Sequence, residues 1–495
     1  MKRKVLNRVM AASLAAIMTV GMAGCGNNNN SEPAPSNDVP GSSDNVTPDD
    51  GGNVDDGGEV VDDGGEVGQY TVINDPATGA PYDLGGVEII IRDWWSPEEP
   101  EAPRNDYEEA QLDYREWAQE TYNFTIKQVA ISDWGSAPQD FVDYVSTGGD
   151  DNWYVFTLRD DVATTSAMAT GLMYDLSTLD CLDFSEPKFT KNKLHEMYGK
   201  NGSIYCMYAG NSEPRTGIFF NKRILTEAGI NPEDIYDMQA AGTWTWDAWT
   251  GLMSQVQRDL DNDGVTDVWG FDVNNGVFTM NAIYSNGGEL VGQDASGKYT
   301  YRLEDPETLE ALEWAVSVFD DYMEVEPEDA QWDYYKTAFT SGECAFMVED
   351  AYNITGMLVD MQDDWGFVMF PKGPRASDYT NCWSNNPACI PGCYDADKAW
   401  KIAFAWNLWT DDVPGYEDYA GWKVGYLNSA RDTRTVDETC AMMVEKGMIT
   451  FHGVIPNMDT AAPFQWVIGK GTDVSAVVES VRESWKTYID EANAM

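Results

Sequence analysis

Residues 85–91 read Gly-Gly-Val-Glu-Ile-Ile-Ile, and they open the part of the chain that decides the fold. A short β-branched run that follows two glycines is typical of a buried strand. Asp106 is the predicted cap of the helix that comes next. Ala110, Tyr114 and Ala118 share one face of that helix, so it should pack against the strand.

Two further strands continue this pattern. They are predicted at 124–131 and 153–158, with a helix at 141–145 between them. A β-α-β-α-β order predicts a mostly parallel sheet covered by helices. Further strands are predicted at 203–208 and 217–220, and further helices near 245–258, 306–323, 333–341, 395–410 and 473–492.

The first residues have the pattern of a secretion signal. A basic head at 2–8 is followed by an apolar run at 9–22, which is too short for a typical membrane-spanning helix. The run ends in Met22-Ala-Gly-Cys25, which resembles the lipobox of bacterial lipoproteins. That resemblance implies removal of the signal peptide 1–24 and a lipid on Cys25. The alternative is an ordinary secretory signal with a chance cysteine.

Residues 25–69 are predicted to form a disordered acidic tether. Beyond Cys25 the stretch is rich in Asn, Asp-Gly and Gly-Gly, and it contains no Lys, Arg or aromatic residue up to position 68. Such a segment buries too little apolar surface to offset the entropy lost on ordering. Glycine content and like charges make it a flexible, extended leash.

The chain is very acidic, with 84 Asp and Glu against 31 Lys and Arg and a formal net charge of −53. This charge would repel nucleic acid and anionic headgroups, so it excludes DNA and RNA as partners. Its simplest meaning is solubility. It also argues weakly against an anionic ligand.

The chain has 8 cysteines, so an odd number remains when Cys25 is set aside. Cys382, Cys389 and Cys393 lie close together, but their spacing forms no Cys-x-x-Cys pair and no histidine is near them. We therefore expect buried thiols rather than a metal cluster, and one disulfide stays an open alternative.

Five segments resemble motifs of the family 1 extracellular solute-binding proteins of bacteria, and they occur in the family's order over roughly residues 85–490. They are GIFFNKRILTEAGINP at 217–232, TWTWD at 243–247, DGVTDVWGF at 263–271, FTSGECAFM at 339–347 and WGFVMFPKGP at 365–374. The departures are Glu343 and Cys344, where Lys and Ala are common, and a looser match after Asp411.

The resemblance implies an α/β fold of the two-lobe, type II periplasmic-binding-protein kind, with mostly parallel sheets. Lobe 1 would comprise 70–208 plus 376–425, and lobe 2 would comprise 210–375 plus 426–495. Ligands of open α/β sheets sit beyond the carboxyl ends of the strands, and hinged lobes can close around a solute.

The implied function is capture of an oligosaccharide and delivery to the membrane permease of an ABC importer. The protein would be a lipid-anchored monomer on the extracellular face of the cell membrane, would need no cofactor and would not be an enzyme. Two alternatives remain: a surface-tethered glycoside hydrolase, which needs two carboxylates across a cleft, and a binding protein for a non-sugar solute such as a peptide.

A sugar site needs flat aromatic rings for the apolar faces of the sugar and fixed polar groups for its hydroxyls. One of Trp94 and Trp95 could instead be core, and Arg159 and Asp160 could form a solvated loop. For Tyr352 the family resemblance implies a stacking role. The candidates lie at strand ends and crossings: Trp94, Trp95, Arg159, Asp160, Tyr208, Glu213, Tyr284, Asn286, Glu349, Tyr352 and Trp383.

A separate Asp-rich loop resembles the calcium loop of an EF-hand. Gly264 occupies its sixth position, but Gly270 stands where a bidentate Glu is expected, so the set is incomplete. A structural calcium ion and a capped surface turn are the two interpretations. The candidate ligands are Asp259, Asp261, Asp263, Val265 and Asp267.

Overall fold

The computed structural model describes residues 70–96, 103–159, 162–192, 194–382, 386–416, 419–458 and 467–494. The predicted signal peptide and tether lie outside the described residues, as do Cys25, Asp160 and Trp383. Residues 68–495 form one compact unit. It contains two four-stranded sheets.

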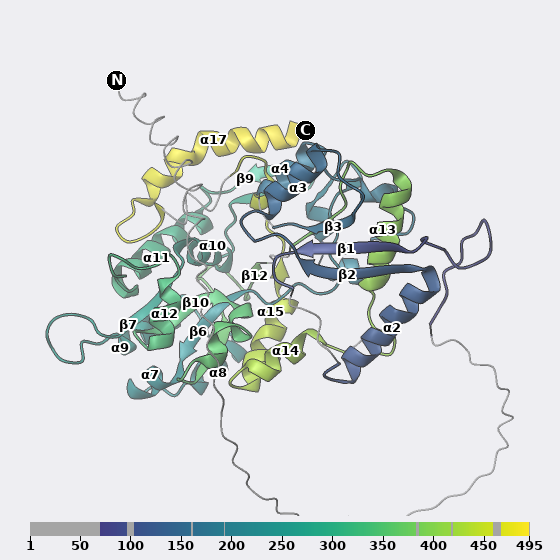
Figure 1. The fold of residues 1–495 in the computed structure, drawn as a ribbon. Helices are drawn as coiled ribbons and strands as arrows, with labels where there is room; N and C mark the ends of the chain where they lie inside the picture. Colours follow the sequence, from purple (N-terminus) through teal and green to yellow (C-terminus); the bar gives the residue numbers. More distant parts are fainter. Residues whose placement is uncertain are drawn as a thin grey trace, which may run out of the picture. The chain divides into compact units, whose positions relative to one another are not determined.

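The first sheet is built from the predicted N-terminal strands. β1 (Val87–Asp93) pairs in parallel with β2 (Phe124–Ala130) and with β3 (Trp153–Thr157). β13 (Ala388–Cys389) adds to β3 in the antiparallel sense. The strand order β13-β3-β1-β2 therefore confirms the predicted parallel β-α-β-α-β arrangement. The accompanying helices are α2 (Asp106–Tyr122), α3 (Ala137–Ser146), α4 (Val162–Ala169) and α13 (Ala396–Trp409) (Figure 1).

The cap of α2 differs from the prediction. Asn105, not Asp106, is the N-cap, and its side chain accepts a hydrogen bond from the backbone N–H of Glu108 at 2.9 Å. Asp106 lies inside the first turn, where its charge favours the helix N-terminus without capping it. The predicted inner face is confirmed at Tyr114 and Ala118, which are buried.

The second sheet contains β6 (Thr216–Asn221), β7 (Trp269–Val273), β10 (Cys344–Asp350) and β11 (Trp365–Met369) in the order β11-β6-β10-β7. Of the three pairings in this sheet only that of β10 with β7 is parallel, because β6 runs antiparallel to both of its neighbours. The sheets of this protein are therefore partly parallel. β6 and β11 are buried along their whole length, which explains their continuous apolar sequence.

The remaining elements connect and cover these sheets. The predicted strand at 203–208 is shorter than expected, because only its first two residues form a strand, while Met207 makes an isolated antiparallel bridge with Ala388. The elements of the first half are η1 (Leu176–Thr178), α5 (Pro187–Thr190), α6 (Leu194–Met197), β4 (Gly199–Lys200), β5 (Ser203–Ile204), α7 (Lys222–Glu227), α8 (Glu233–Ala240), α9 (Trp246–Val256), α10 (Asn275–Ser285), β8 (Val291–Gln293) and β9 (Tyr299–Tyr301). Those of the second half are α11 (Pro306–Tyr322), α12 (Tyr334–Ser341), η2 (Ala351–Ile354), η3 (Met357–Asp360), β12 (Asn381–Cys382), α14 (Trp422–Ser429), η4 (Thr435–Cys440), α15 (Ala441–Glu445), β14 (Gly447–Met448), η5 (His452–Val454) and α17 (Val474–Ala494).

Each sheet has its own hydrophobic core. Ile89 and Val155 are buried in the first-sheet core, and Phe219 and Trp365 are buried in the second. The chain around η5 joins the two halves, because Val454 packs with residues of α3 and β3 while the next residue belongs to the second core.

The cysteines and helices of the described part bear on disulfide formation and on membrane spanning. All seven described cysteines are free thiols, so the alternative of a disulfide is not met among them. Burial raises the pKa of the Cys389 thiol. Among the described helices, none combines the length and the apolar character needed to span a bilayer.

Two carboxyl groups are buried at the edge of the second sheet. Asp272, in β7, is 0% exposed, and Glu324, just after α11, is 6% exposed. Burial raises the pKa of Asp272 to about 8. Burial and the neighbouring Glu343 raise the pKa of Glu324 to about 7.

These two carboxyls should make the protein less stable as the pH rises from about 5 to 8. The folded state keeps protons that the unfolded chain releases near pH 4, so it binds more protons in this window and the free energy of unfolding falls with pH. We expect Asp272→Asn to reduce that fall by on the order of 2 kcal/mol. Urea unfolding at both pH values measures it.

The matched control is Asp294→Asn, which changes an exposed carboxylate of the β8–β9 turn. General charge repulsion affects both variants alike, so their difference isolates the buried group. Equal pH dependence in wild type and Asp272→Asn would contradict the assignment.

Candidate functional site

Aromatic side chains gather where the parallel strands of the first sheet end. Trp94 and Trp95 follow β1, with ring centroids 4.8 Å apart and planes at 78°. Trp134 comes after β2 and is 63% exposed. Arg159 follows β3, and its Cζ lies 4.3 Å from the centroid of the Trp134 ring. Parallel strands end at one edge, so this edge offers flat rings beside a guanidinium.

Trp134 was missed by the sequence analysis. It follows the second strand of the parallel set, so the rule that selected Trp94 and Arg159 would also have selected it. Its 63% exposure, compared with 48% for Trp95, makes it the more accessible ring of this edge.

A buried carboxylate holds the turn that carries the two tryptophans after β1. Asp93 is 1% exposed and ends β1. Its carboxylate accepts hydrogen bonds from Gln128 Nε2 at 2.6 Å and from the backbone N–H of Ser96 at 3.2 Å. These bonds fix the direction in which the chain leaves the strand.

The second sheet presents a polar cluster where β10 ends. Glu349 is 5% exposed, and the Tyr335 hydroxyl donates to its Oε2 at 2.5 Å. Asp350 accepts a hydrogen bond from Thr216 Oγ1 at 2.6 Å. Burial, followed by the neighbouring Asp350, raises the pKa of Glu349.

Arg215 brings several predicted residues together. Its guanidinium lies 3.5 Å from a carboxylate oxygen of Glu213 and 3.8 Å from one of Asp350. Burial opposes the charge of Arg215, but the two carboxylates outweigh burial and raise its pKa. Burial and Glu213 raise the pKa of the Tyr208 hydroxyl. Arg215 itself was missed, although it lies only two residues before the predicted strand at 217–220.

A cavity of about 430 Å³ opens beside Tyr352. Tyr352 is 46% exposed, and Trp332, which precedes the lining residue Asp333 in the chain, is 72% exposed. Lys336 Nζ lies 5.8 Å from the Trp332 ring and 5.7 Å from the Tyr352 ring. Trp332 and Lys336 were also missed by the sequence analysis. Trp332 lies just before α12 and Lys336 lies within it, so both are far in sequence from the end of any strand. The lining residues are Asp333, Lys336, Thr337, Thr340, Tyr352, Asn353, Gly356 and Met357.

Tyr284 and Asn286 are buried and lie outside the lining of this cavity. Tyr284 is 2% exposed, and its hydroxyl lies 2.8 Å from His452 Nδ1. Burial lowers the pKa of His452 to about 4, so the ring is neutral at neutral pH. Asn286 is 0% exposed and donates to the Glu307 carbonyl and to Glu310 Oε2, both at 2.9 Å. Both side chains are thus engaged within the protein.

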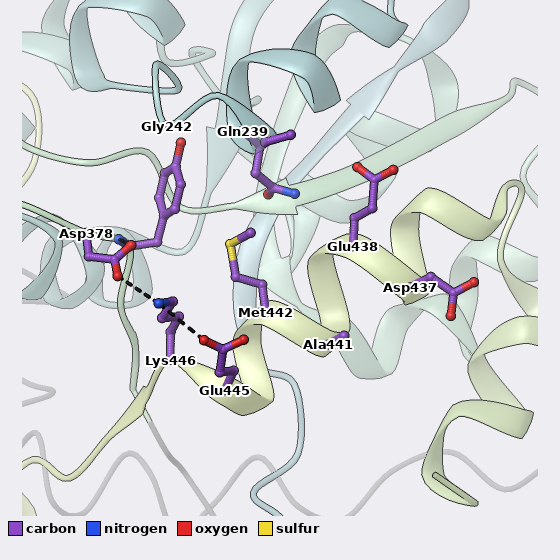
Figure 2. Close-up of a pocket in the computed structure, with 11 residues that line it drawn as sticks. Gln239, Gly242, Asp378, Asp437, Glu438, Ala441, Met442, Glu445 and Lys446 are labelled. Carbon is purple, nitrogen blue, oxygen red and sulfur yellow. Dashed lines mark hydrogen bonds and ion pairs between the residues drawn. The ribbon is translucent and has the colours of Figure 1, made fainter. Parts of the chain in front are cut away.

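A second cavity, of about 390 Å³, is lined by the end of α8, the chain before β12 and α15 (Figure 2). Lys446 forms ion pairs with Asp378 at 2.7 Å and with Glu445 at 3.4 Å. The pair with Asp378 connects the chain before β12 to the end of α15. The lining contains none of the predicted site residues.

The Asp-rich loop has part of the geometry of a cation site. Carboxylate oxygens of Asp259, Asp261 and Asp267 lie within 4.8 Å of one another. Asp263 instead accepts a hydrogen bond from the backbone N–H of Val265 at 2.7 Å. The exposed carboxylates fit a calcium ion only as a partial set, since Gly270 lies in β7 without a ligand atom in its side chain. Structural calcium stays a prediction.

A family model and several solved structures match this chain. Residues 207–402 match the sequence model of the family described as bacterial extracellular solute-binding protein. This match confirms the resemblance found in the five motifs. No curated protein matches the chain by sequence.

Solved structures of similar fold cover most of the chain. The GacH receptor of Streptomyces glaucescens is 13% identical with a TM-score of 0.54, over 82% of this chain and 99% of that one. UgpB from Mycobacterium tuberculosis is 16% identical with a TM-score of 0.54, over 77% and 95%. The MalE domain from Bdellovibrio bacteriovorus is 13% identical with a TM-score of 0.54, over 82% and 100%. These likenesses confirm the two-lobe, periplasmic-binding-protein-like fold.

Arg215 should contribute to stability more than an exposed arginine does. Arg215→Met leaves Glu213 and Asp350 without their shared cation, and we expect the free energy of unfolding to fall by about 2 kcal/mol. Arg223→Met, which removes an arginine paired with Glu227 and Asp363 on the surface, should cost less than about 1 kcal/mol. Urea denaturation measures both, and equal losses would contradict the role of Arg215.

Proposed function

We propose, from the match of residues 207–402 to the model of the family described as bacterial extracellular solute-binding protein, that this chain captures an oligosaccharide and delivers it to the permease of an ABC importer. The family and the fold are those of solute-binding proteins, which are not enzymes. The observation that carries the sugar assignment is a pair of exposed rings. Tyr352 lines a cavity of about 430 Å³, and the Trp332 ring lies 5.8 Å from Nζ of the lining residue Lys336.

The chemistry of this cavity suits a neutral sugar. A pyranose ring offers an apolar C–H face, which stacks on an aromatic ring, and hydroxyls, which need donors and acceptors. Trp332 and Tyr352 supply exposed rings, while Lys336, Asn353 and Asp333 supply polar groups in the lining. Large aromatic side chains that stay exposed beside a cavity are typical of binding surfaces.

We assign the edge of the first sheet to the opposite wall of the same site. Its rings are Trp94, Trp95 and Trp134, with Arg159 as a donor. Hinged closure would bring this wall against the ligand. Asp160 and Trp383 keep their predicted contact roles, and so do Tyr208, Glu213 and Glu349. We place Tyr284 and Asn286 behind the site as supports, because both are buried.

Similar proteins are described with ligands of two classes. The GacH receptor is described in complex with acarbose, and the MalE domain is described as bound to maltotriose. UgpB is described in complex with glycerophosphocholine, which favours a non-sugar solute as the second candidate.

The aromatic pair provides the direct test of sugar binding. A panel of neutral oligosaccharides should contain one that raises the melting temperature, because ligand binds only the folded state. Trp332→Ala and Tyr352→Ala should each lower the affinity for that ligand by about tenfold, because a stacking contact is lost. Calorimetric titration measures the change.

Tyr419→Ala is the control for this pair, since Tyr419 is 45% exposed and packs against Tyr107 away from the cavity. A panel without any thermal shift would refute sugar capture, and normal binding by both cavity variants would show that the site is misplaced. Glycan cleaved during long incubation would favour the glycoside hydrolase.

The proposed location requires a lipid at Cys25. Lipid on this residue and the acidic stretch behind it would keep the binding lobes near the importer while letting them reach outward. In the native host, Cys25→Ser should abolish incorporation of labelled palmitate and move the protein into the culture fluid. Fractionation followed by immunoblotting measures this, and a membrane-bound Cys25→Ser protein would contradict it.

A further inference from the structure

The ammonium group of Lys336 lies among three aromatic rings. Its Nζ is 5.8 Å from the ring centroid of Trp332, 5.6 Å from that of Tyr335 and 5.7 Å from that of Tyr352. All three distances fall within the range of a cation–π contact. Tyr335 belongs to α12, Trp332 lies two residues before that helix, and Tyr352 comes from η2 after β10. Trp332, Tyr335 and Tyr352 are called the aromatic cage below.

A buried carboxylate completes this environment. Glu349 Oε2 lies 3.6 Å from Lys336 Nζ, and the side chain of Glu349 is 7% exposed. The Tyr352 hydroxyl lies 3.3 Å from the same nitrogen. Both contacts are longer than a good charge-assisted hydrogen bond, so the three ammonium hydrogens are not fully used by these two groups.

Aromatic rings around a carboxylate are the chemistry that proteins use to bind organic cations. Cations are also attracted to this protein as a whole, because its formal net charge is −53. A site with such rings therefore needs a reason to prefer a neutral sugar over an amine or a quaternary ammonium ion. In this structure the place of the cation is taken by Lys336.

We propose that Lys336 is the specificity-determining residue of the solute site, a built-in cation that fills the aromatic cage and keeps cationic solutes out. The inference rests on the proposed function, since it assigns the selectivity of the same cavity. The ammonium donates to uncharged ligand oxygens, such as hydroxyls. Two carboxyl groups, those of Glu349 and of the lining residue Asp333, accompany the single ammonium group of Lys336, so an anionic solute is not favoured either.

The experiment removes the internal cation and offers an external one. Lys336→Ala keeps a strong helix former in α12 and opens the aromatic cage beside the cavity of about 430 Å³. The probe is tetramethylammonium chloride, titrated by calorimetry at pH 8 and constant ionic strength, with tert-butanol as its neutral counterpart. We expect Lys336→Ala to bind tetramethylammonium at least about tenfold more tightly than wild type and to bind tert-butanol no better.

Two further variants control the result. Lys336→Arg retains a cation in the aromatic cage and should not gain affinity for the probe. Lys398→Ala removes a lysine whose Nζ lies 3.9 Å from the Tyr394 ring and 5.4 Å from the Trp153 ring on the first-sheet half, and it should behave as wild type. Melting curves verify that each variant is folded.

The outcomes separate this inference from the proposed function. Wild type that binds tetramethylammonium as tightly as Lys336→Ala overturns the inference, and so does a folded Lys336→Ala variant without a gain over wild type. A gain in Lys336→Ala supports it even if the oligosaccharide panel fails, in which case only the sugar assignment falls. A gain shared by Lys398→Ala would reflect lost surface charge and would also overturn it.

Discussion

The antiparallel pairing of β6 with β10 is the constraint on which the second half of the candidate site depends. Its register sets Thr216 opposite Asp350 and Gly217 opposite Glu349. Arg215, one residue before β6, is thereby brought beside the carboxylates that end β10. Gly217 permits the close approach of β11 on the other side, because a Cβ there would lie 2.4 Å from the Val368 carbonyl oxygen.

The electrostatics of the protein follow from how few cations it has. The chain has 31 basic against 84 acidic residues, and the half-buried cations near the site lie beside carboxylates. Arg215 lies between Glu213 and Asp350, and Lys336 lies beside Glu349. Where burial outweighs the effect of a nearby cation, the carboxyl group keeps its proton: burial raises the pKa of Asp272 to about 8 although Lys470 lowers it. These carboxyl groups are thus neutralised either by a neighbouring cation or by a proton.

The elements that could be predicted are those whose signal is local. The strands β1 to β3 carry short β-branched or aromatic runs, and helices such as α9, α11, α13 and α17 carry an apolar period, so these were found within a few residues, whereas α10 was not predicted. The antiparallel neighbours of β6 could not be predicted, because a fully buried strand reads the same in either direction. The cap of α2 was misplaced by one residue, since Asn105 and Asp106 are both good cap residues.

For the site, the sequence by itself determined which kinds of side chain end the strands: Trp94 and Trp95 after β1, Arg159 after β3, and Glu349 and Tyr352 at the end of β10. A strand end is visible in sequence, and its neighbours in the chain are known with it. Only the tertiary structure decided that Trp332 and Lys336 meet Tyr352, and that Asn286 turns inward to Glu310. Such contacts join distant parts of the chain, and their distances depend on how whole elements pack rather than on any local pattern.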